Sequence, residues 1–132
     1  MESPAIDLKD YLLDYSDLSS AQMEFVFGTN LFVGRLPETS VLCVCLFDLP
    51  GPEPDENNIR SSVIKIMVRG LKDYQTTWDA IELVSTIFHN LTEETINSSR
   101  YIQIRKIVEP SHVGNDEKGR PIFSCSLQAM RA

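Results

Sequence analysis

The chain has 132 residues, the size of a single domain with one packed core. Hydrophobic residues make up 42% of it and charged residues 23%, which indicates a folded domain and excludes general disorder. The net charge of −7 argues against a dedicated nucleic-acid-binding protein, and no apolar run approaches the roughly 18 residues that a membrane helix needs.

The first predicted element is a helix that begins at Ser3-Pro4, with the serine as N-cap and the proline in the first turn. Its apolar stripe consists of Leu8, Tyr11, Leu12 and Tyr15. The opposite face carries acids that we expect to be solvated, namely Asp7, Asp10, Asp14 and Asp17. Residues 17–20 are expected to end this helix.

Extended segments are predicted next. Residues 23–36 look extended, and residues 41–47 are apolar on both faces, which is typical of a central strand. Residues 62–70 alternate, so that one face is buried while Lys65 and Arg69 lie on a half-exposed basic face. Between these two strands, residues 48–59 form a loop with three prolines and four acids.

The best-defined element is a helix from about residue 73 or 76 to about residue 91 or 94, with a broad apolar stripe. Trp78 and Leu83 flank that stripe. They either widen the buried face or face a neighbouring subunit, where tryptophan is enriched.

The chain then has two extended runs, 100–108 and 121–130, joined by a long hairpin with a polar tip at 109–120. This order of elements predicts a single α+β domain over residues 1–132. We expect a mainly antiparallel sheet of about four to five strands with two helices on one face.

The chemistry of an enzyme is missing from the sequence. No glycine-rich phosphate loop is present, and Cys43-x-Cys45 has no second pair for a metal site. His89 and His112 sit at no ligand spacing, and cysteines in an apolar strand are inert small side chains. We therefore expect no catalytic residue, no metal and no cofactor. The three cysteines also suggest a reducing compartment.

Four stretches in order resemble the tail-terminator (minor capsid) family of long-tailed bacteriophages. They are LFVGRLP at 31–37, FDLPG at 47–51, IKIMVRG at 64–70 and GNDEKGRPIFS at 114–124. Each is weak alone, because each is partly strand-and-turn chemistry, but their order and spacing, with a helix before the fourth, are specific. The resemblance covers residues 29–128. The Cys43-Val44-Cys45 run is not part of that pattern.

The resemblance implies a structural virion protein, assembled in the host cytoplasm, that forms a homohexameric ring on the head-proximal end of the tail tube. Such a ring stops tube polymerisation and contacts the tail tube protein below and a neck or head-completion protein above. Genomic DNA would pass through the lumen without specific binding. The family has no catalytic residues to carry over.

Charge and loop length select candidate contact residues. Residues 1–30 hold six acids against one base, and residues 60–72 hold four bases and no acid, which suits head-to-tail self-association. The acidic loop and the hairpin tip are longer than a connection requires, and each either engages a partner or is simply solvated. The candidate contacts are Asp55, Glu56, Asn57, Asn58, Lys65, Arg69, Trp78, Asp116, Lys118 and Arg120.

Two alternatives remain open from the sequence. The first is a head-completion or stopper protein of the neck, which is also a small acidic ring subunit. The second is a cytosolic accessory enzyme or binding domain on the same layout, which would show a deep pocket with convergent polar groups.

Overall fold

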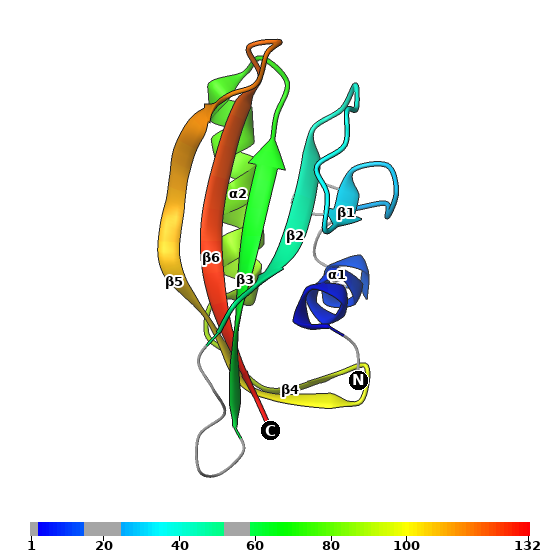
Figure 1. Ribbon diagram of the computed structural model, residues 1–132, viewed down its shortest axis with the longest axis vertical. Coiled ribbons are helices and arrows are strands. Elements are labelled where there is room, and N and C mark those ends of the chain that lie inside the picture. The colour runs from blue at the N-terminus through cyan, green and yellow to red at the C-terminus, as the bar shows by residue number, and fades with distance from the viewer. Residues whose placement is uncertain (1–2, 15–24, 52–58) are drawn as a thin grey trace.

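The computed structural model describes residues 3–14, 25–51 and 59–132 and contains two helices and one six-stranded sheet (Figure 1). The elements in chain order are α1 (Pro4–Asp14), β1 (Leu31–Val33), β2 (Cys43–Leu49), β3 (Arg60–Arg69), α2 (Tyr74–Phe88), β4 (Leu91–Ile96), β5 (Ser99–Asn115) and β6 (Pro121–Arg131).

The sheet has the order β1-β2-β3-β6-β5-β4. Every neighbouring pair is antiparallel except β1 and β2, which are parallel. The predicted α+β class is confirmed. The predicted four to five antiparallel strands are too few, because β4 is an additional strand and the parallel β1 makes the sheet mixed.

Both helices and one face of the sheet enclose the main core. α1 contributes Ala5, Leu8 and Leu12. Strict alternation puts four β6 side chains into this core, and in α2 the broad stripe predicted from the sequence is buried. The buried β6 side chains are Phe123, Cys125, Leu127 and Ala129.

α2 begins as predicted, because the Asp73 side chain accepts a hydrogen bond from the Gln75 backbone N–H. Its predicted end near residue 91 or 94 is wrong. The chain turns at Asn90, which adopts a φ of 62°, and β4 follows at once. The Asn97-Ser98 pair, with φ values of 50° and 68°, then forms the tight turn that joins β4 to β5.

The hairpin of β5 and β6 has a much shorter loop than predicted. β5 continues to Asn115, so only residues 116–120 connect the two strands. Register shifts interrupt the pairing with β6 on both sides of Val108 and again near Val113. These bulges accommodate Pro110 and Gly114, which the sequence suggested as loop residues.

Asp7 is completely buried, which corrects the expectation of a solvated acidic face on α1. Its carboxylate accepts hydrogen bonds from the hydroxyl of Tyr101 and from the side chain of Asn97, the latter at 3.0 Å. The guanidinium of Arg131 lies 3.8 Å away. All three partners come from the C-terminal third of the chain, so no local pattern in α1 reveals them.

Two glycines of the recognised stretches stand where a side chain has no room. A Cβ added to Gly70 would lie 1.7 Å from the hydroxyl oxygen of Thr77, which is buried in the first turn of α2. A Cβ on Gly51 would lie 2.2 Å from the carbonyl oxygen of Ser61. The two glycines therefore allow α2 and the start of β3 to pack closely on the chain.

Cys43 and Cys45 point away from the main core into a small second cluster with Phe32, on the other face of the sheet. Cys45 is buried and its thiol donates to the carbonyl of Arg35. Burial raises the pKa of Cys45 to about 11 and that of Cys125 to about 12.

No helix in the described residues is long and apolar enough to cross a membrane.

The buried Asp7 contact predicts a stability effect. We expect Tyr101→Phe to lower the free energy of unfolding by about 1–3 kcal/mol, because the Asp7 carboxylate loses a buried donor. Tyr74→Phe is the matched control: Tyr74 is 53% exposed, so its change should stay within about 0.5 kcal/mol. Urea unfolding of both variants measures the difference, and equal effects would contradict the role of the Asp7 contact.

The raised thiol pKa values predict a second effect. At pH 8 the buried cysteines should not react with a thiol reagent until the protein unfolds.

The same pKa shifts predict how stability depends on pH. In the unfolded chain the thiols ionise near pH 8.5, whereas in the folded protein Cys45 and Cys125 stay protonated to higher pH. The unfolded state therefore binds fewer protons, and stability should fall as the pH rises from about 9 toward 11. Cys125→Ala should make this fall shallower, and an unchanged slope would exclude Cys125 as a cause.

Candidate assembly surfaces

The β5–β6 tip is a rigid turn built around Asp116. Its carboxylate accepts from the backbone N–H groups of Lys118 at 3.0 Å and Arg120 at 2.9 Å, and from the Arg120 side chain at 2.7 Å. The Asp116 backbone N–H in turn donates to the Arg120 carbonyl. Three of the predicted contact residues are thus brought together in one short loop.

Arg120 ties this tip to the loop between β1 and β2. Its guanidinium donates to the Thr39 carbonyl at 2.7 Å and to both carboxylate oxygens of Glu38, at 2.9 and 2.8 Å. Lys118 adds an ion pair to Glu38 at 2.8 Å. The Arg120 side chain is only 9% exposed, so most of its donors serve the chain itself.

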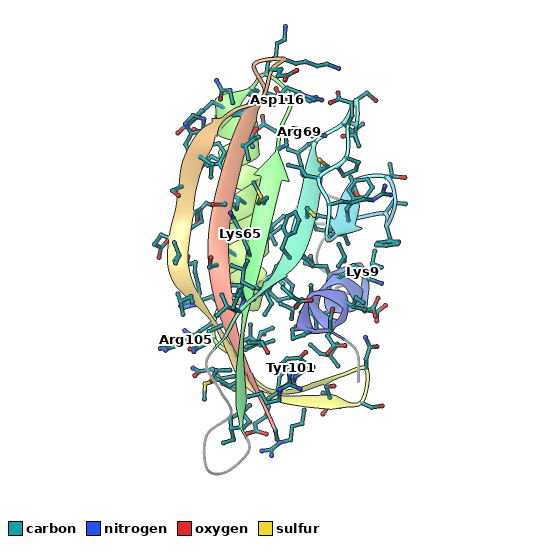
Figure 2. The ribbon with its side chains drawn as sticks, viewed as in Figure 1. Lys9, Lys65, Arg69, Tyr101, Arg105 and Asp116 are labelled. Atoms are coloured by element: carbon teal, nitrogen blue, oxygen red, sulfur yellow. The ribbon has the colours of Figure 1, made fainter. Side chains whose placement is uncertain are left out.

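Arg69 holds the same loop from the end of β3. It is 5% exposed and donates to the Pro37 carbonyl and, at 3.2 Å, to the Thr39 hydroxyl. The expectation that Arg69 lies on a half-exposed basic face is therefore wrong. The sequence could not show this, because Pro37 and Thr39 lie some thirty residues earlier in the chain. Figure 2 shows Arg69 and Asp116 at the same end of the sheet.

The charges of this network are stabilised by one another. Hydrogen bonds from Lys118 and Arg120 lower the pKa of Glu38. Burial raises the pKa of Asp116, but the backbone and side-chain donors of Arg120 outweigh it, and the net pKa is lowered. Both carboxylates are therefore ionised at neutral pH, and the end of the molecule presents a fixed arrangement of two acids and two bases.

The other candidates are placed separately. Lys65 is half-buried on the sheet face opposite the helices, opposite Ser126 of β6. Trp78 packs on the core in a T-shaped contact with Phe123, with ring centroids 5.8 Å apart, so much of its ring is in contact within the chain. Residues 55–58 lie outside the described residues.

On the sheet face opposite the helices, the β1–β2 part holds the small apolar cluster, whereas the part formed by β5 and β6 carries polar side chains. Arg105 is exposed there and donates to the Gln128 side chain at 3.2 Å, and Ser124 and Ser126 line its centre. Figure 2 shows Lys65 in the middle of this face and Arg105 nearer the end that holds Tyr101. Arg105, Glu38 and Thr39 were not among the contact residues predicted from the sequence, because none of the three stands in a local pattern that marks a contact.

Nothing in the described residues forms a catalytic centre. They contain no group of three or more histidine, cysteine or acidic side chains that could hold a metal. A depression of about 370 Å³ lies where α1 begins and β2 ends, with Asp48, Arg60 and Arg131 in its wall. The Asp48 carboxylate accepts a hydrogen bond from the Ala5 backbone N–H at 3.0 Å, so it stabilises the packing of α1 on β2. Ser61 and Ser62 also line the depression, but no hydrogen bond among the described residues joins either hydroxyl to the Asp48 carboxylate, so they form no nucleophile–base pair.

The comparison with protein families decides the assignment. The model of a family described as bacteriophage tail terminator protein matches residues 13–131, nearly the whole chain. The chain belongs to this tail terminator family. It is therefore a structural protein of the virion, located at the tail, and not an enzyme.

A solved structure similar to this tail terminator comes from the "virion of native gene transfer agent (GTA) particle". The TM-score is 0.71 over 98% of this chain and 94% of that chain, at 13% sequence identity. At this identity the likeness shows a shared fold. No curated protein matches the sequence.

The hydrogen bonds from Arg69 and Arg120 to the loop between β1 and β2 predict a local effect on backbone motion. In the terminator carrying Arg120→Ala, we expect the backbone order parameters of residues 37–39 to fall from about 0.85 to below about 0.6, because the loop loses its anchor to the tip. Lys118→Ala removes one exposed ion pair and should leave them near the wild-type value. Relaxation measurements by NMR test both variants, and an equally rigid loop in Arg120→Ala would contradict the anchor.

Proposed function

We propose that this protein ends growth of the tail tube by forming a homohexameric ring on its head-proximal end, and that the ring then joins the tail to the neck. The family match over residues 13–131 carries the proposal. The two distinct ends of the sheet and the net charge of the chain support it.

The two ends of the sheet supply the surfaces along the tail axis. At one end are the tip 116–120 and its partner loop, fixed by Arg69 and Arg120. At the other end β2 finishes at Leu49 and β3 begins at Arg60, on either side of the acidic segment with Asp55–Asn58. Figure 1 shows these two ends at the top and bottom of the elongated sheet. We assign one to the tube protein and the other to a neck or head-completion protein.

A ring with the proposed stoichiometry is strongly negative. Six copies carry a formal charge of −42, six times the −7 of one chain. Such a ring has little net attraction for phosphates, which suits a lumen through which genomic DNA slides without being held.

Electron microscopy of lysates from a phage with a nonsense mutation in this gene tests the function. We expect overlong, unjoined tail tubes beside DNA-filled heads, because nothing stops tube polymerisation. Restoring the wild-type gene from a plasmid should return tails of uniform length.

The same experiment separates the terminator from a head-side component. Tails of normal length beside heads that leak DNA would refute termination and favour a stopper or head-completion protein of the neck.

A further inference from the structure

The exposed apolar side chains gather at the two lateral ends of the sheet. Ten large apolar side chains are exposed among the described residues, and six of them form two groups. The first, the α1 patch, consists of Leu13, Val26 and Phe27. The second, the β5 patch, consists of Ile107, Val108 and Val113. Their exposed fractions run from 39% to 56%.

The α1 patch lies where α1 covers β1. The ammonium of Lys9 stands 4.6 Å from the centre of the Phe27 ring, which joins the helix to the segment before β1. Leu13 follows Lys9 by one helical turn, so it lies on the same side of α1. Phe27 pairs in turn with Leu31 of β1. The three apolar side chains therefore lie along the β1 end of the sheet.

The β5 patch lies at the opposite lateral end. β4 pairs only with the first part of β5, up to Ile104, so within the described residues no strand pairs with the outer edge of residues 105–115. The three patch residues fall at or beside the register shifts of this segment. Figure 1 shows β5 on one side of the sheet, and α1 with β1 on the other.

The β-bulges determine how another protein can bind at the open edge of β5. A regular open edge invites another strand to add by backbone hydrogen bonds, and bulges prevent that. An interface here must instead rest on the apolar side chains that the bulged segment exposes. Exposed apolar groups of this kind are typical of surfaces that bind protein.

The charges beside the two patches are of opposite sign. On α1, Lys9 pairs with Asp10 at 2.6 Å, which leaves the charge of Asp14 in excess. Along β5 from residue 105 onward, Lys106 pairs with Glu109 at 3.2 Å, which leaves the charge of Arg105 in excess. A surface that meets a different surface of the next copy needs this complementarity, whereas two copies of one patch would bring like charges together.

We propose that the α1 patch of one subunit packs on the β5 patch of the next, and that this contact closes the ring. The proposal rests on the ring function given above and assigns the surface that builds the ring. A stable contact buries roughly 800 Å² on each partner, about a ninth of the 7119 Å² surface of one subunit. The two lateral ends supply one such surface each and leave both axial ends free for the tube and the neck.

Cross-linking inside assembled tails tests the contact. Plasmid copies with Phe27→Cys, Val108→Cys or both would complement the nonsense phage, and purified tails would be treated with a short bismaleimide. The double variant should give a ladder of multimers on a denaturing gel, and each single variant should stay monomeric. Wild type controls for the native thiols. Leu49→Cys with Val108→Cys controls for an exposed pair of which only Val108 lies in a patch.

The possible outcomes distinguish a failure of the proposed interface from a failure of the proposed termination function. A dimer from either single variant would mean a two-fold contact and would overturn the proposal. Tails of normal length with only monomers from the double variant would also overturn it, while leaving termination intact. A ladder of equal strength from the Leu49 control pair would show that the linker does not report the patches, and would equally count against them.

A charge test covers the case in which cysteine variants assemble poorly. We expect Val108→Glu with Val113→Glu to fold normally, because both side chains are more than half exposed, and to yield overlong tails as the nonsense phage does. Thr86→Glu, at an exposed position of α2 that belongs to neither patch, should yield uniform tails. A circular dichroism melt verifies folding of the purified variants, and uniform tails from the Val108/Val113 variant would refute the β5 patch.

Discussion

The buried carboxylate of Asp7 is the constraint on which the arrangement of this subunit depends. A charge without solvent needs close partners, and here Tyr101, Asn97 and Arg131 supply them. These residues are separated from Asp7 by 94, 90 and 124 positions in the chain. The first helix is thereby fixed against the β4–β5 turn and the last strand, and its position in turn sets where the apolar groups around Phe27 emerge.

At the opposite end of the sheet, two arginines hold the chain in place in a similar way. The carboxylates that Arg120 contacts are more exposed to solvent than Asp7 is. Arg69 approaches Thr39 from the end of β3 and donates to its hydroxyl, and Arg120 approaches from the β5–β6 tip and donates to its carbonyl. The two arginines thereby hold the loop between β1 and β2 in place beside the hairpin tip. Both basic residues looked like surface contacts, yet their main effect is to shape the surface that Asp116, Lys118 and Glu38 present.

The sequence could predict those features that depend on residues close together in the chain. The alternation in β6 and the start of α2 at Asp73, one of the two starts expected, depend on local sequence and were predicted correctly. β4 was missed because its six residues, Leu91–Ile96, continue the helical pattern, and only the left-handed turn at Asn90 interrupts it. The burial of Asp7 and Arg69 depends on partners distant in the chain, which periodicity cannot reveal. Of the contact candidates, the hairpin tip is placed as one cluster, but its partner Glu38 had no local sequence signal.

The close packing around Gly51 and Gly70 has a consequence for how such proteins diverge. Two of the four stretches that resemble the family contain these glycines, and a Cβ there would strike Ser61 or Thr77, so these positions reflect how the chain is folded. The side chains of the α1 and β5 patches all lie outside those four stretches. Two related phages could thus keep the same subunit architecture while their patches drift apart. If the subunits join through these patches as proposed, then in a host infected by both phages each would build its rings from its own copies, and mixed rings would be excluded without any change in the fold.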